Sequence, residues 1–219
     1  MKRSDITIRV MEYITNSKPE SRYSSFDYCY NYFRTNVDIT SDIEKSCLVL
    51  GFYLASWGMF RGSSFILQKS VKHFQPLMQY ISSLQRPVWN IDVDSYNFKN
   101  IQAILEIYNQ VKKFIVPSGS QDLTLVSKIL LGVFGFVPAF DDNFCKSFRD
   151  IFQSQCGFRV VNENALNCVK QFYEKNRSEI DLLSAEAFTT DFVSGEKTKI
   201  HYPKAKIIDM YGWQKAFVS

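Results

Sequence analysis

Hydrophobic residues recur at helical spacing along most of the chain. Near the N-terminus, for example, Ile6, Val10 and Ile14 fall on one side of a helix. The same periodicity predicts helices over residues 26–33, 47–57, 63–71, 76–84, 101–115, 123–133, 142–152, 162–172 and 204–217. Only residues 159–161 and 198–202 hint at strands, and both are too short to carry a fold. We therefore expect an all-α protein, one helical domain over residues 1–219, built as an orthogonal helical array with at most minor strands.

Two of the predicted helices are apolar on all sides, which is typical of buried helices. The first, residues 47–57, follows Thr40 or Ser41 and Glu44, a spacing that predicts a capping box. We expect this helix to be the buried central one. The second, residues 123–133, is followed by Gly135 and Pro138, which end it before a new helix begins at residue 142.

The composition favours a compact intracellular protein without a metal. Hydrophobic residues make up 46% of the chain and aromatic residues 16%, which argues against disorder. Five cysteines without a CxxC spacing and only two histidines give no zinc or iron–sulfur pattern, so we expect reduced, buried cysteines and no cofactor.

The predicted location is the cytoplasm. The N-terminal segment has no signal-peptide h-region, and the longest apolar stretch, residues 47–60, is too short to span a membrane. A net charge of +4 and a pI near 8.7 weakly favour a nucleic-acid partner. The sequence leaves the oligomeric state open.

The segment Ser118–Phe148 is the most informative part of the sequence. It contains a Gly/Ser-rich turn, a buried helix ending in Phe134-Gly135, and then Phe136-Val-Pro-Ala-Phe-Asp141 before a new helix. This order resembles the core of helix-hairpin-helix DNA glycosylases, over about 30 residues. The family's Leu-Pro-Gly-Val-Gly hairpin is replaced here by Pro117-Ser-Gly-Ser-Gln121.

The resemblance implies a DNA N-glycosylase that flips a modified or damaged base out of double-stranded DNA and leaves an abasic site, in repair or in phage defence. By motif position the catalytic aspartate is Asp141, which stabilises positive charge at C1′. Thr124 takes the position of the Schiff-base lysine of bifunctional members, which implies a monofunctional enzyme. Lys128, thirteen residues before Asp141, is the candidate for a lyase or auxiliary role. The alternative for Asp141 is a plain helix N-cap, and for Lys128 a paired lysine at a helix edge.

Two further groups of residues are candidates for substrate binding. A base pocket needs side chains that stack on the base and hydrogen-bond to its edge. The candidates for this pocket are Trp57, Asp209, Trp213 and Gln214. Turns and helix starts with exposed backbone N–H groups predict DNA-phosphate contacts, for which the candidates are Arg61, Ser63, Ser120 and Thr124. The alternatives are a helix break around Arg61 and a C-terminal helix that only closes the core.

Two other functions compete with the glycosylase hypothesis. A non-catalytic helical module that binds nucleic acid or protein is one, since no catalytic signature is strong. A HEPN-like ribonuclease is the other, and it is disfavoured because no Arg-x4–6-His motif precedes His73.

Overall fold

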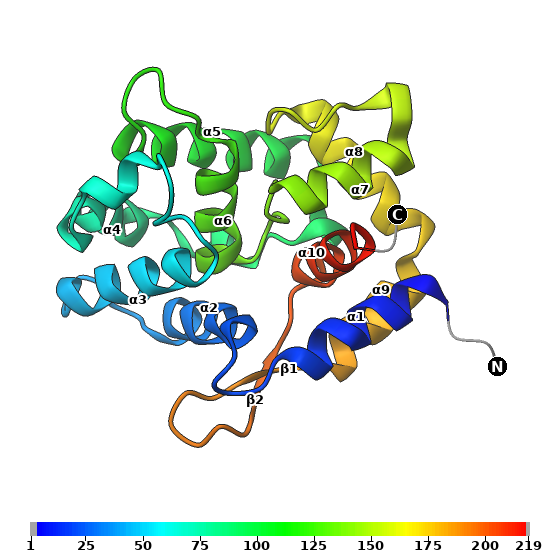
Figure 1. The fold of residues 1–219 in the computed structure, drawn as a ribbon, viewed down its shortest axis with the longest axis horizontal. Coiled ribbons are helices and arrows are strands. Elements are labelled where there is room, and N and C mark those ends of the chain that lie inside the picture. Colours follow the sequence, from blue (N-terminus) through cyan, green and yellow to red (C-terminus); the bar gives the residue numbers. More distant parts are fainter. Residues whose placement is uncertain (1–3, 218–219) are drawn as a thin grey trace.

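The computed structural model describes residues 4–217, and it confirms an all-α fold with minor strands. Ten α-helices lie within this range, joined by short 3₁₀ turns and one two-stranded sheet (Figure 1). The helices are α1 (Asp5–Asn16), α2 (Ser25–Thr35), α3 (Ile43–Ser56), α4 (Gln75–Ser83), α5 (Phe98–Ile115), α6 (Leu123–Phe134), α7 (Asp142–Phe152), α8 (Glu163–Lys175), α9 (Arg177–Glu186) and α10 (Lys204–Lys215). No helix among the described residues is long and apolar enough to cross a membrane.

Helix α6 is the central helix of the fold. Every residue from Leu125 to Phe134 is buried, and α6 packs against α2, α3 and α5 (Figure 1). Its approach to α3 depends on Gly132, where a Cβ atom would lie 2.4 Å from Cε1 of Tyr53. The prediction of a buried helix over residues 123–133 is confirmed.

The expectation that residues 47–57 form the buried central helix is wrong. In α3 the side chains of Leu48 and Phe52 are 48% and 69% exposed, although Leu50 and Leu54 are fully buried. Apolar composition alone does not tell which face of a helix meets solvent.

The N-cap of α3 also differs from the expected capping box. Asp38 binds the backbone N–H groups of Thr40 and Ser41 in a turn of its own, with Oδ1 at 2.9 and 3.1 Å. The cap is Asp42 instead, whose carboxylate accepts from the N–H of Lys45.

Helix α10 connects the C-terminal part of the chain to its beginning. It packs on α1, α7 and α9 (Figure 1). The start of α10 is fixed by Asp92, whose carboxylate accepts from the backbone N–H groups of Lys204 (2.7 Å) and Ala205 (3.0 Å). Because burial removes this carboxylate from water, the pKa of Asp92 rises to about 6.

A small hairpin leads into α10. Strands β1 (Phe188–Thr190) and β2 (Lys197–His201) pair in antiparallel fashion. The predicted strand at residues 198–202 is confirmed in essence, whereas residues 159–161 lie in a bend, and the sequence pattern did not predict β1 or α9. Buried Asp27 of α2 holds the hairpin by accepting from the N–H of Thr190 and the hydroxyl of Tyr202, both at 2.8 Å.

Gly135 ends α6 in a conformation that only glycine adopts readily. Its φ is +73°, and a Cβ atom there would lie 2.7 Å from Cγ of Pro203 and from Cε2 of Tyr30. We expect Gly135→Ala to lower the free energy of unfolding by about 2–4 kcal/mol, since it adds overpacking to backbone strain. Chemical denaturation measures the change.

Gly119 provides the matched control. Its φ is +80°, yet nothing lies within 4 Å of the position that a Cβ atom would take, so Gly119→Ala tests backbone strain without the clash. Equal losses for the two variants would contradict a role for close packing at Gly135.

Candidate functional site

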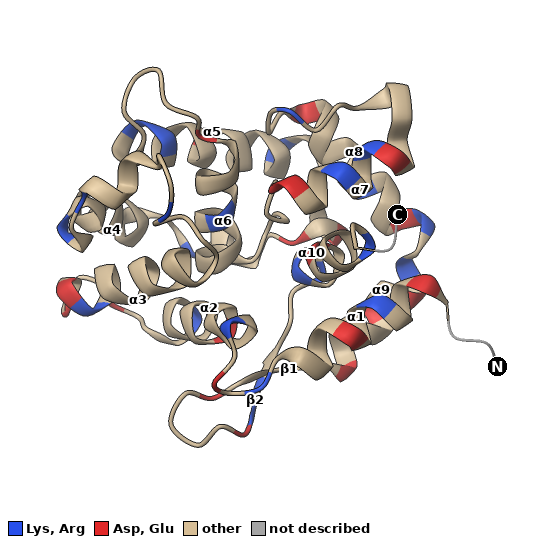
Figure 2. Ribbon diagram, viewed as in Figure 1, with Lys and Arg blue, Asp and Glu red and all other residues tan. Residues whose placement is uncertain are grey.

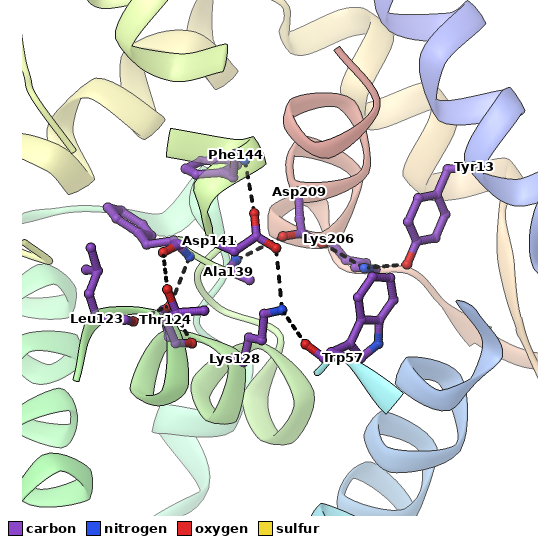
Figure 3. Close-up of polar contacts among 12 residues, drawn as sticks. Tyr13, Trp57, Leu123, Thr124, Lys128, Ala139, Asp141, Phe144, Lys206 and Asp209 are labelled. Atoms are coloured by element: carbon purple, nitrogen blue, oxygen red, sulfur yellow. Dashed lines mark hydrogen bonds and ion pairs between the residues drawn. The ribbon is translucent and has the colours of Figure 1, made fainter. Parts of the chain in front are cut away.

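Asp141 lies where the turn after α6 meets α7. Its Oδ1 accepts from the backbone N–H of Phe144 at 3.0 Å, so Asp141 is the N-cap of α7, as the alternative interpretation expected. Its second oxygen, Oδ2, is free of the cap and lies 3.4 Å from Nζ of Lys128 (Figure 3). One carboxylate therefore fixes the helix start with one oxygen and presents the other to a buried lysine.

Lys128 projects from the middle of α6 with a side chain that is only 6% exposed. Its Nζ also donates to the backbone carbonyl of Trp57 at 3.2 Å (Figure 3). Burial lowers the pKa of Lys128, although the charge of Asp141 acts in the opposite direction. Burial likewise raises the pKa of Asp141, against the effect of Lys128. The pair thus places an amine whose pKa is lowered by burial beside a carboxylate whose pKa is raised by burial.

A second buried pair on α10 lies beside the first. Nζ of Lys206 is 2.7 Å from Oδ2 of Asp209 and donates to the hydroxyl of Tyr13 at 3.0 Å. The other oxygen of Asp209 accepts from the backbone N–H of Ala139 at 2.9 Å (Figure 3). Asp209 therefore holds in place the turn that carries Asp141.

Four aromatic rings enclose these charged groups. The rings of Tyr13 and Trp57 are parallel within 5°, with centroids 6.4 Å apart, and Tyr23 and Trp213 stand edge-on to both. The ammonium of Lys206 lies 4.6 Å from the ring centroid of Tyr13 and 5.5 Å from that of Trp57. Such ring faces suit a planar or cationic group.

Two of these rings, Trp57 and Trp213, line one small cavity together with the two charged pairs. Trp57, Lys128, Asp141, Asp209 and Trp213 all contribute to it, so the structure brings together residues that are far apart in the chain. Gln214, also predicted for the base pocket, is not among the lining residues. The space is about 10 Å³, which is hardly one water molecule, so a nucleobase enters only if the rings move apart.

The predicted phosphate-contacting residues gather in a second, larger cavity. Its volume is about 940 Å³, and it is lined by residues that include Arg61, Ser63, Ser120 and Thr124. The hydroxyl of Thr124 donates to the carbonyl of Phe140 at 3.1 Å, next to Asp141. Phe140 and Asp142 also line this cavity, which places it directly beside the Asp141 site.

No protein-family model, curated protein or solved structure matches this chain. Among residues 4–217 no group of three or more His, Cys, Asp and Glu side chains is arranged to hold a metal ion, and all five cysteines are free and buried.

Sequence reasoning missed three parts of this site. Lys206 pairs with Asp209 three residues later on α10, a spacing that the sequence does contain. Tyr13 and Tyr23 come from the N-terminal part of the chain. The sequence around them does not indicate a site, because an aromatic residue in an amphipathic segment usually serves only packing.

Proposed function

We propose that this protein is a DNA N-glycosylase that takes one nucleotide out of the base stack and cleaves its glycosidic bond. The observation that carries the proposal is the Lys128–Asp141 pair, buried beside ring faces and next to a large cavity lined by basic residues. A base flipped out of a helix needs such an apolar, aromatic pocket, and the sugar needs a fixed carboxylate.

Asp141 stabilises the reaction electrostatically. As the C1′–N bond lengthens, positive charge builds on the sugar, and a carboxylate fixed by its helix cap opposes that charge without reorganisation. Because burial keeps water away, the interaction is stronger than it is in bulk solvent.

The second role in the proposed reaction is that of a nucleophile, and we assign it to the amine of Lys128. In its neutral form Nζ attacks C1′, the C1′–N bond breaks, and the base leaves with the bonding electron pair and takes a proton from solvent. The proton that Nζ loses passes to Asp141 and from there to O4′ as the C1′–O4′ bond breaks, which gives a protonated imine that water hydrolyses to the abasic sugar and the free amine. Thr124 aligns with the lysine of bifunctional family members, which predicts a monofunctional enzyme in which water attacks C1′. The position of Lys128 beside Asp141 favours the amine as the nucleophile instead.

Borohydride trapping tests this mechanism. With DNA that carries a panel of modified bases, we expect a reduced covalent adduct between protein and DNA, seen as a shift on a denaturing gel. Lys128→Arg keeps the positive charge beside Asp141 but forms no imine, so the adduct should be lost. The control is Lys113→Gln, which changes an exposed lysine in the last turn of α5. This variant should leave the adduct yield unchanged.

Base release without any adduct from the parent protein would show that water is the nucleophile and that Lys128 only positions Asp141. No base release from any substrate in the panel would favour the non-catalytic binding module.

A further inference from the structure

The cavity of about 940 Å³ has features that the proposed cleavage chemistry does not use. It extends from the loop after α3 to the segment after α7 and reaches the residues on both sides of Asp141. This volume is at the upper end of the roughly 300–1,000 Å³ of small-molecule pockets. It accommodates a short stretch of one strand.

Three arginines line the cavity from separate elements. Arg61 follows α3, Arg149 lies in the last turn of α7, and Arg159 lies in the segment between α7 and α8. All three are exposed, and within residues 4–217 none forms an ion pair with a carboxylate. Figure 2 shows basic positions on α7. Guanidinium groups without protein partners are suited to phosphate oxygens.

Two carboxylates also line this cavity, and only one of them is neutralised. Asp122 is 2.9 Å from Nζ of Lys112 and accepts from the hydroxyl of Tyr108 at 3.0 Å. Asp142 is exposed at the start of α7 and has no such partner among the described residues. Three arginines against one unpaired carboxylate leave the cavity positively charged.

The residue before Arg159 is anchored in the core. Phe158 has a φ of +47°, which is uncommon for a residue with a side chain, and its ring is fully buried against Phe140 and Phe148. The buried ring anchors the backbone directly before Arg159, and both residues line the cavity.

Part of the remaining lining is apolar. Met59, Phe65 and Leu123 are half-buried and line the cavity together with polar residues such as Ser63, Ser120 and Thr124. A lining with both cationic and apolar groups fits a strand with unpaired bases, because such a strand offers both phosphates and open base faces, whereas the bases of a duplex are stacked inside.

We infer that this cavity binds a single strand of nucleic acid beside the target nucleotide. Arg61, Arg149 and Arg159 contact its phosphates, and its unpaired bases pack on Met59, Phe65 and Leu123. The inference rests on the proposed function. It narrows the substrate class to DNA that is single-stranded or locally opened around the target base.

Fluorescence anisotropy with unmodified oligonucleotides tests the inference without any cleavage. The parent protein should bind a labelled single strand more tightly than the matching duplex, and more tightly than a mononucleotide. Arg149→Gln/Arg159→Gln should weaken single-strand binding roughly tenfold. It should also reduce the slope of log affinity against log salt by about 1.4, since each contact to a single strand contributes about 0.7.

The control removes the same charge elsewhere. Lys175→Gln/Arg177→Gln changes two exposed basic residues near the junction of α8 and α9 that do not line the cavity. Equal losses in both double variants would overturn the inference, as would tighter binding of duplex or equal binding of a mononucleotide.

Base release from modified DNA, measured on the same proteins, separates this inference from the proposed function. If the arginine substitutions change neither base release nor single-strand binding, the strand site is rejected and the glycosylase proposal is kept. Loss of single-strand binding in a protein that releases no base would keep the strand site and reject the glycosylase.

Discussion

Asp141→Asn should lower single-turnover base release by about 100- to 1,000-fold, since removal of a preorganised electrostatic group costs about 3–4 kcal/mol in the transition state. The side chain is nearly isosteric, and its remaining oxygen can still accept from the N–H of Phe144. Asparagine is also a good N-cap, so the start of α7 should persist. Because buried Lys128 loses its charged partner, a thermal melt and DNA binding of the variant are measured alongside its rate of base release. Alkaline cleavage of abasic sites measures the rate.

The adjacent residue offers a matched control for this substitution. Asp142 carries the same charge at the start of the same helix but is exposed and does not line the closed cavity. Asp142→Asn should therefore change base release by less than a few-fold. If Asp141→Asn released base at the parent rate, Asp141 would be only a helix cap.

The segment that carries Asp141 could be predicted because its signals are local. Gly135 and Pro138 end one helix, and α7 begins at the residue where the acidic pair predicts it. These features depend on a few neighbouring residues, and the buried side chains of α6 confirm them.

The rest of the site depends on contacts that no local pattern contains. The hydroxyl of Tyr13 and Nζ of Lys206 meet across 193 residues of sequence. Lys128 is another example: its helical position was readable, but its distance from Asp141 depends on how the turn after α6 folds back. Helix α9 was missed because its pattern is mostly polar, with Ile180 and Leu183 as its buried residues.

The Lys206–Asp209 pair should contribute strongly to stability. Its side chains are only 3% and 9% exposed, so removal of one partner leaves a buried charge without compensation. We expect Lys206→Met to lower the free energy of unfolding by about 3–5 kcal/mol, measured by chemical denaturation.

A second variant separates the cost of the unpaired Asp209 charge from the cost of lost packing. Lys206→Met/Asp209→Asn removes both charges and keeps an oxygen that accepts from the N–H of Ala139, so the turn before Asp141 stays anchored. This double variant should recover a substantial part of the loss, because neutral groups are less costly to bury than one unpaired carboxylate. The exposed ion pair of Arg177 and Asp181 is the control, and Arg177→Met should cost less than about 1 kcal/mol. A double variant as unstable as Lys206→Met would mean that the lysine acts through packing on the rings of Tyr13 and Phe26 rather than by neutralising Asp209.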